Sequence, residues 1–207
     1  MKWIQIPLGP LQTNCYILHN SDKECIIFDP GDQGDDLNKY LKSEGFRPLA
    51  ILMTHAHFDH IGAIDSVRDQ WKIPVYIHEK ESEWLTNPTL NGSARYGITI
   101  TSRAADNLIS FEEPLEIGPF LLNILFTPGH SPGSISYYSK EANALFAGDT
   151  LFDGSIGRTD LPGGNHEQLL KSIKTKLFPF QNSTEVLPGH GPATTIKKEK
   201  VSNPFLQ

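Results

Sequence analysis

Apolar residues follow two patterns along this chain, short runs between turn residues and longer runs with helical spacing. Short apolar runs bounded by Gly, Pro, Asn or Asp are typical of β-strands, whereas apolar residues three and four positions apart are typical of helices. We expect helices over residues 35–44, 61–71, 79–85 and from the N-cap Asn165 to about Leu177. We expect strands over residues 3–7, 14–19, 24–28, 49–53, 74–77, 108–111, 115–117, 120–126, 134–138, 143–147 and 184–187.

Strands and helices alternate irregularly in this pattern, which indicates an α/β chain with two sheets and helices packed outside them. Residues 86–106 are polar and have no clear period, so we expect a surface loop or insertion there. The chain has 207 residues and a hydrophobic content of 38%. These values suit one domain over residues 1–207 with a sizeable core.

A dense cluster of ligand-type side chains follows the apolar run 49–53. His55, His57, Asp59 and His60 stand within six residues. Imidazole and carboxylate groups are the ligands that borderline metals such as zinc prefer. The alternative is four solvated polar side chains in a loop, but the density of the cluster favours metal binding.

Three further ligand-type residues occur in the same local context, a strand followed by a tight turn that contains Gly or Pro. His130 follows the apolar run 120–126, and Asp149 and His190 follow the strand-like runs 143–146 and 185–186. The remaining histidines lack this context, and we interpret them as surface or core residues: His19, His78 and His166.

The composition excludes several classes of partner. The formal net charge is −6, and the basic residues are scattered apart from the run 197–200, which argues against nucleic acid. No run approaches the roughly 20 apolar residues of a membrane span, and the N-terminus lacks a signal-peptide pattern, so we expect a cytoplasmic protein. For Cys15 and Cys25 we favour two free, buried thiols over a disulfide.

The order of these motifs resembles the metallo-β-lactamase fold and, within it, the short glyoxalase II-like (hydroxyacylglutathione hydrolase-like) group. The resemblance runs from Asp29 to His190 and implies a four-layer αββα sandwich of two mixed sheets with a metal site at one edge. It implies two divalent metal ions, zinc in the first place, with iron or manganese as alternatives. His55, His57 and His130 would hold the first metal and Asp59, His60 and His190 the second, with Asp149 bridging both.

The resemblance also assigns roles beyond the ligands. Asp29 would orient a ligand histidine, although its place before Pro30 also suits a plain turn former. Arg158, in the Gly-Arg-Thr-Asp stretch, matches a position that contacts glutathione and would bind a substrate carboxylate; its alternative is a surface ion pair with Asp160. The C-terminal helical domain of the longer enzymes is not expected here, because few residues follow His190.

These features predict a metal-dependent hydrolase of a small-molecule thioester such as S-lactoylglutathione. Two metals about 3.5–4 Å apart lower the pKa of a shared hydroxide toward about 7, which suits attack on the thioester carbonyl. Asp59 and Asp149 would therefore be catalytic. An aspartate at the bridging position, where one lactamase class has a cysteine, argues against β-lactam hydrolysis.

Three alternatives stay open at this point. A persulfide dioxygenase would use one iron held by His55, His130 and Asp149, a set that suits iron oxygenase chemistry. A lactonase is a further alternative. A metal-binding structural or regulatory module would bind metal without turnover. The sequence does not determine the oligomeric state.

Overall fold

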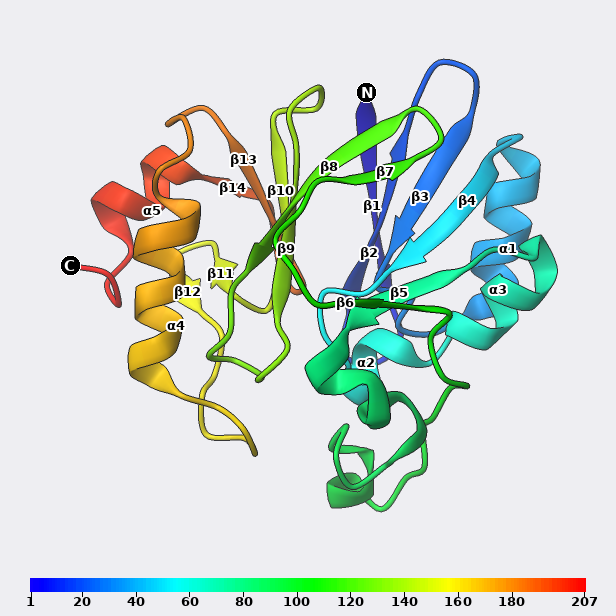
Figure 1. Ribbon diagram of the computed structural model, residues 1–207, viewed down its shortest axis with the longest axis horizontal. Helices are drawn as coiled ribbons and strands as arrows, with labels where there is room; N and C mark the ends of the chain where they lie inside the picture. Colours follow the sequence, from blue (N-terminus) through cyan, green and yellow to red (C-terminus); the bar gives the residue numbers. More distant parts are fainter. The chain divides into compact units, whose positions relative to one another are not determined.

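The computed structural model describes residues 1–207 as two compact units, the N-terminal unit Met1–Ser110 and the C-terminal unit Phe111–Gln207. Each unit contains one six-stranded sheet (Figure 1). Both sheets mix parallel and antiparallel strands, which confirms the prediction of two mixed sheets. The single domain over residues 1–207 stays a prediction.

The sheet of the N-terminal unit has the strand order β1-β2-β3-β4-β5-β6. The first three strands are antiparallel, and β3 to β6 run parallel. Parallel strands end at a common edge, so the loops that follow β3 and β4 meet there. The bounds are β1 Lys2–Leu8, β2 Thr13–His19, β3 Glu24–Phe28, β4 Arg47–Leu52, β5 Val75–His78 and β6 Asn107–Ile109.

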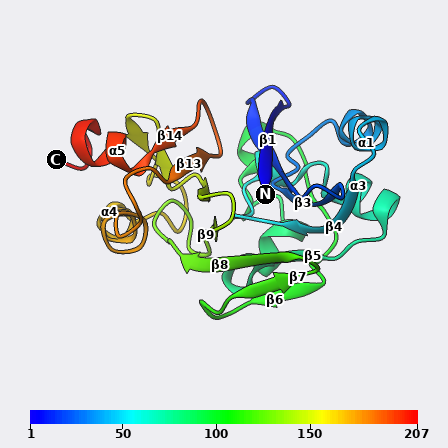
Figure 2. The ribbon, with the colours of Figure 1, turned by 90° about the horizontal axis from the view of Figure 1, so that it is seen from above.

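Two helices lie side by side against this sheet, as Figures 1 and 2 show for α1 (Gly34–Ser43) and α3 (Ile64–Trp71). Their apolar faces bury Leu37, Leu41 and Val67 in the core of the unit. Each such side chain contributes about 1.5–3 kcal/mol on burial. The unit also contains the short helix α2 and two 3₁₀-helices, with bounds α2 Phe58–Ile61, η1 Glu79–Thr86 and η2 Ser93–Tyr96.

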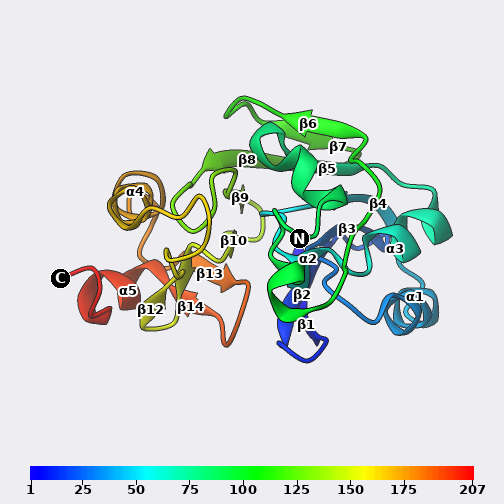
Figure 3. The same cartoon turned by 90° about the horizontal axis from the view of Figure 1, so that it is seen from below.

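The sheet of the C-terminal unit has the strand order β14-β13-β10-β9-β8-β7, and a β11–β12 hairpin stands apart from it. The helices α4 and α5 pack on one side of this sheet through a shared apolar cluster (Figure 3). The strands are β7 Leu115–Ile117, β8 Phe120–Phe126, β9 Ile135–Ser139, β10 Ala144–Gly148, β11 Leu151–Phe152, β12 Ser155–Ile156, β13 Glu185–Pro188 and β14 Thr194–Thr195. The helices are α4 His166–Ser172, which continues as the π-helix η3 Ile173–Leu177, and α5 Ile196–Ser202.

The helix expected over residues 61–71 is divided into α2 and α3, so this prediction is wrong at its start. The break occurs at Gly62 and Ala63, whose backbone N–H groups donate to the carbonyls of Gly31 and Pro30 at 2.9 Å. Those bonds replace the helical ones and separate α2, which begins inside the histidine cluster, from α3.

Other predictions need smaller corrections. The helix expected over 79–85 is a 3₁₀-helix, the expected loop 86–106 contains η2, and the strand expected to reach residue 111 ends at Ile109. The elements β11, β12, β14 and α5 were not predicted. Two predictions are confirmed: Asn165 caps α4 by accepting a hydrogen bond from the Gln168 N–H, and the two cysteines are free and buried.

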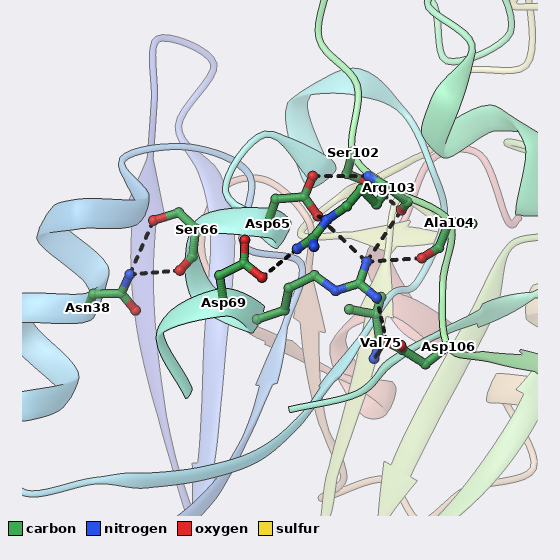
Figure 4. A network of polar contacts seen from close by, with 10 residues as sticks. Asn38, Asp65, Ser66, Asp69, Val75, Ser102, Arg103, Ala104 and Asp106 are labelled. Atoms are coloured by element: carbon green, nitrogen blue, oxygen red, sulfur yellow. Dashed lines mark hydrogen bonds and ion pairs between the residues drawn. The ribbon is translucent and has the colours of Figure 1, made fainter. Parts of the chain in front are cut away.

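A polar network fixes residues 103–106 onto α3 (Figure 4). The Arg68 Nη2 atom lies 2.6 Å from Asp106 Oδ2, and Arg103 Nη2 lies 2.6 Å from Asp69 Oδ1. Arg103 also donates to Asp65, both through its backbone N–H and through Nε. The end of the irregular segment 86–106 is thereby held against a helix.

No helix of the structure combines the length and the apolar character needed to cross a membrane.

Candidate metal centre

The histidine cluster of the N-terminal unit lies between the end of β4 and the end of α2. The ring of His55 lies 4.9 Å from that of His57 and 4.1 Å from that of His60, between centroids. The carboxylate of Asp59 joins them, because its Oδ2 atom is 3.6 Å from His60 Nε2. The structure thus brings all four ligand-type side chains of the cluster together.

Asp29 follows the end of β3 and forms hydrogen bonds with residues of this cluster. Its carboxylate accepts hydrogen bonds from the Thr54 backbone N–H at 2.7 Å, from Thr54 Oγ1 at 2.5 Å and from His60 Nδ1 at 3.1 Å. Since a carboxylate only accepts, Nδ1 of His60 carries the proton and Nε2 presents a lone pair. This arrangement is the one that fixes a metal-ligating imidazole.

Through Thr54, Asp29 also orients the ring of a second histidine, His55. Its hydroxyl donates its only proton to Asp29, so it accepts from His55 Nδ1, which is 3.1 Å away. The His55 ring therefore also presents Nε2 as a lone pair. Asp29 thus orients His60 directly and His55 through Thr54.

The turn that carries Asp29 needs a glycine at position 31. A Cβ atom there would lie 2.0 Å from the backbone oxygen of Asp59, which no side chain tolerates. Asp29 itself has the left-handed backbone angle φ 46°, which is less costly for Asp than for most residues. The close approach of this turn to α2 places the Asp29 carboxylate within hydrogen-bonding distance of His60 Nδ1.

Besides Thr54, two further positioning residues were not predicted from the sequence. Thr13, at the start of β2, donates from Oγ1 to Asp59 Oδ2 at 2.9 Å. Glu81, fully buried in η1, accepts from the backbone N–H of Ala56 at 2.6 Å and so holds the loop between His55 and His57. Both contacts join distant parts of the sequence, and no local pattern marks them.

In the C-terminal unit, His130, Asp149 and His190 converge at the ends of neighbouring strands. His130 Nε2 lies 3.5 Å and His190 Nε2 3.7 Å from the same oxygen, Asp149 Oδ2. The parallel pairing of β10 and β13 brings Asp149 and His190 together, because the two strands end at the same edge of the sheet. The Gly189 N–H donates to Gly148 O at 2.8 Å at this edge.

The ring of His130 is held by the loop that contains Arg158. Its Nδ1 atom lies 2.8 Å from the backbone carbonyl oxygen of Arg158, so Nδ1 donates and Nε2 presents a lone pair toward Asp149. The loop approaches closely because residue 157 is a glycine: a Cβ there would lie 1.8 Å from the Asp149 backbone oxygen.

The side chain of Arg158 forms a bidentate ion pair with Asp160. Its Nε donates to Oδ1 at 2.8 Å, and its Nη2 donates to Oδ2 at 2.7 Å. Both side chains are exposed to solvent. The structure therefore contains the surface pair that was the alternative to substrate binding, while the backbone of Arg158 contacts a ligand-type histidine.

The donor groups fit a divalent metal. Two ligands at about 2.1 Å in a tetrahedral arrangement lie about 3.4 Å apart. The spacing of 3.6 Å between His60 Nε2 and Asp59 Oδ2, and the spacings of 3.5 and 3.7 Å around Asp149, are close to this value. An imidazole lone pair and a carboxylate oxygen repel each other at such distances unless a cation lies between them.

The sequence profile of the metallo-beta-lactamase superfamily matches residues 8–190. The chain therefore belongs to this superfamily of metal-binding hydrolases, and the predicted family and fold class are confirmed.

Individual relatives agree with this assignment. The chain is 56% identical over 207 residues to the probable metallo-hydrolase YqgX of Bacillus subtilis (strain 168), covering 100% of this chain and 98% of that protein. It is 35% identical over 203 residues to the hydroxyacylglutathione hydrolase GloC of Haemophilus influenzae, covering 97% and 96%.

Two solved structures are also similar. The crystal structure of the BLEG-1 B3 metallo-beta-lactamase has a TM-score of 0.97 and 56% identity, and the match covers 99% of both chains. The structure of TTHA1623 in a di-iron-bound form has a TM-score of 0.86 and 38% identity, covering 98% of this chain and 100% of that one.

Proposed function

We propose that this metallo-hydrolase cleaves thioesters such as S-lactoylglutathione at a two-metal site. One observation carries the proposal: each unit gathers imidazole and carboxylate donors, and three of the histidines have Nδ1 held by an oxygen, so that their Nε2 lone pairs face the other donors. The 35% identity to a hydroxyacylglutathione hydrolase supports the choice of substrate.

The ligand roles follow the family order of the motifs. We assign the first metal to His55, His57 and His130. We assign the second metal to Asp59, His60 and His190, with Asp149 shared by both. The similar structure in a di-iron-bound form supports a pair of metals and supports iron as an alternative to zinc.

The bound metals would supply a hydroxide at neutral pH and polarise the thioester carbonyl. The residues of the chain prepare this chemistry. Asp29 and Thr54 keep the proton on Nδ1 of His60 and His55, so that each Nε2 stays a ligand. Thr13 fixes the rotamer of Asp59 through its hydrogen bond.

Arg158 is our candidate for holding a carboxylate of the substrate. It would exchange its exposed partner Asp160 for the substrate anion, at little cost because exposed ion pairs contribute only about 0–1 kcal/mol. The leaving thiol has an unperturbed pKa of about 8.5, so it departs as a thiolate with little acid assistance.

A second candidate function is β-lactam hydrolysis. The aspartate at position 149 argued against it, yet a solved structure that is 56% identical is called a B3 metallo-beta-lactamase. The absence of a bridging cysteine therefore carries less weight than the sequence alone indicated.

The deciding experiment is a substrate panel on purified protein loaded with zinc, iron or manganese. The panel contains S-lactoylglutathione, a cephalosporin, a lactone and a persulfide with oxygen consumption recorded, and the metal-stripped protein is the control. We expect metal-dependent release of thiol from the thioester at the highest kcat/KM. A higher kcat/KM for the cephalosporin or lactone, or oxygen uptake without thiol release, would contradict the proposal.

A further inference from the structure

A cavity of about 310 Å³ lies within the N-terminal unit, between the β1–β2 turn and the segment around η2. Its volume is at the lower end of the range of small-molecule pockets, about 300–1,000 Å³. Most of its wall is apolar, and the larger apolar side chains are Leu8, Leu11, Phe58, Tyr96, Ile98 and Ile100.

The wall of the cavity formed by Phe58 and Tyr96 is held in place by packing and hydrogen bonds. The rings of Phe58 and Tyr96 pack at 5.2 Å between centroids, and the Phe58 N–H donates to Asn91 O at 3.0 Å. The buried amide of Asn91 in turn donates to the carbonyls of Trp84 and Ile100. The segment 86–106, which the sequence predicted as a loop, is therefore held by hydrogen bonds and presents aromatic and aliphatic side chains to the cavity.

The charge of the lining restricts the ligand. The cavity has no Lys, Arg or His in its wall, and its two charged groups are the carboxylates of Asp32 and Asp59. Two carboxylates and an otherwise apolar wall repel an anion and desolvate a polar group without compensation. The carboxylates of glutathione are therefore excluded from this cavity, and an uncharged apolar group suits it.

The mouth of the cavity also carries apolar side chains that face solvent. Leu11 is 53% exposed and Tyr96 is 62% exposed. Contiguous exposed apolar patches mark interaction sites and ligand-binding grooves, whereas scattered single apolar side chains are ordinary. Asp59 lines the cavity and is also a proposed metal ligand, so the cavity adjoins the proposed metal centre. Thr13, which donates a hydrogen bond to Asp59, lines the cavity as well.

We propose that this cavity binds the acyl group of the substrate and that the preferred substrates are thioesters of uncharged, apolar acyl chains. This inference rests on the proposed thioester hydrolysis. The reacting carbonyl lies at Asp59, the acyl chain extends along Leu11 and Tyr96, and the polar thiol portion lies outside the cavity.

The test is a series of glutathione thioesters from acetyl to octanoyl, assayed with the metal-loaded protein. Burial of a methylene contributes about 0.8 kcal/mol, so kcat/KM rises about fourfold per added methylene until the cavity is filled. Leu11→Ala reduces kcat/KM for the octanoyl thioester about five- to tenfold and for the acetyl thioester less than twofold. The matched control is Leu108→Ala, since Leu108 is 54% exposed in the same unit but does not line the cavity.

A binding measurement gives a second readout that does not depend on turnover. Octanamide, an uncharged analogue of the octanoyl group, is titrated by calorimetry into wild-type, Leu11→Ala, Tyr96→Ala and Leu108→Ala proteins. We expect weaker binding in the first two variants only. If thioesters are cleaved without any gain from chain length, or Leu108→Ala acts like Leu11→Ala, the cavity proposal is wrong. If no thioester is cleaved while octanamide binding still depends on Leu11, the proposed function fails and the cavity stands.

Discussion

The Nδ1 atom of His60 lies 3.1 Å from Oδ2 of Asp29, and both side chains are buried. The same carboxylate accepts the backbone N–H and the hydroxyl of Thr54, which in turn faces His55. One aspartate in a turn thus sets the orientation of two histidines that lie beyond it in sequence. A change at Asp29 should therefore act on metal affinity without removing a ligand.

Asp29→Asn tests this role. An amide has one acceptor oxygen in place of two, so it cannot accept all three hydrogen bonds from Thr54 and His60, and its NH₂ group faces a donor. We expect zinc affinity to fall about 10- to 100-fold, as for other partners of ligating histidines. Competition with a chromophoric chelator measures this. Asp22→Asn, at an exposed turn, is the control, and equal affinities for the two variants would contradict the role.

Asp59→Ala should remove one metal and most of the hydrolysis without unfolding the chain. Asp59 is only partly buried, and its side chain contacts Thr13 and His60, which lie in the same site. We expect one bound metal per chain instead of two by elemental analysis, with a change in Tm of a few degrees.

The control for Asp59→Ala is Asp36→Ala, which removes a carboxylate from an exposed ion pair with Lys39. Wild-type turnover by Asp59→Ala at saturating metal would mean that the two-metal mechanism is wrong. Retained oxygen consumption with a persulfide would instead favour the one-iron alternative.

Arg158→Ala should raise KM for an anionic thioester more than it lowers kcat. The variant keeps the backbone carbonyl that holds His130, so the metal centre is preserved. A contact remote from the carbonyl is made equally in the ground and transition states and appears mainly in KM. Loss of a charged hydrogen bond costs on the order of 1.5–3 kcal/mol, with the lower end expected at this exposed site.

Asp160→Asn is the matched variant for Arg158, because it breaks the same ion pair and leaves the cation. We expect an unchanged or lower KM with Asp160→Asn, measured by steady-state kinetics at two salt concentrations. If both variants raise KM alike, or neither changes it, the pair is structural and substrate binding by Arg158 is wrong.

The two buried thiols predict a loss of stability at alkaline pH. Burial raises the pKa of Cys25 from 9.0 to about 12. Burial, with the nearby Asp29 and Cys25, also raises the pKa of Cys15 well above 9.0. The unfolded chain releases these protons from about pH 9 upward, whereas the folded chain retains them, so the free energy of unfolding falls between pH 9 and 12. The slope is at most about 1.4 kcal/mol per pH unit for each thiol.

Urea denaturation at pH 8, 9 and 10 measures this slope. The Cys25→Ala variant should lose the contribution of one thiol to the slope of the free energy of unfolding against pH. A variant with the wild-type slope would show that Cys25 titrates alike in both states. Alkylation by iodoacetamide at pH 8 should also be slow in the folded protein, since the thiolate is the reactive form.

Much of the fold could be predicted because its signals are local. The strands β3, β7 and β8 begin and end where the sequence indicated, since turn residues bound each apolar run. The N-cap of α4 is likewise a contact between residues three positions apart, Asn165 and Gln168.

What could not be predicted depends on contacts between distant residues. The helix over 61–71 divides because Gly62 and Ala63 donate to the turn after β3. The segment 86–106 has no period, yet buried Asn91 gives it a fixed shape. Helix α5 escaped notice because its charged sequence shows little apolar spacing, although Thr195 caps it.

The candidate site shows the same division. The ligand-type residues were evident because they share a local context, a strand followed by a turn. Thr13, Thr54 and Glu81, which position them, have no such signal, because each acts through hydrogen bonds that only the folded chain forms.

Stepwise zinc titration of the metal-free protein, with thiol release from S-lactoylglutathione or a longer acyl-glutathione recorded at each step, tests the central claim most directly. The two-metal hydrolase predicts that activity rises until two zinc ions are bound per chain and then stays constant, and that Asp59→Ala reaches only a small fraction of it. Full activity at one equivalent, or no thiol release at any zinc concentration, would contradict the claim.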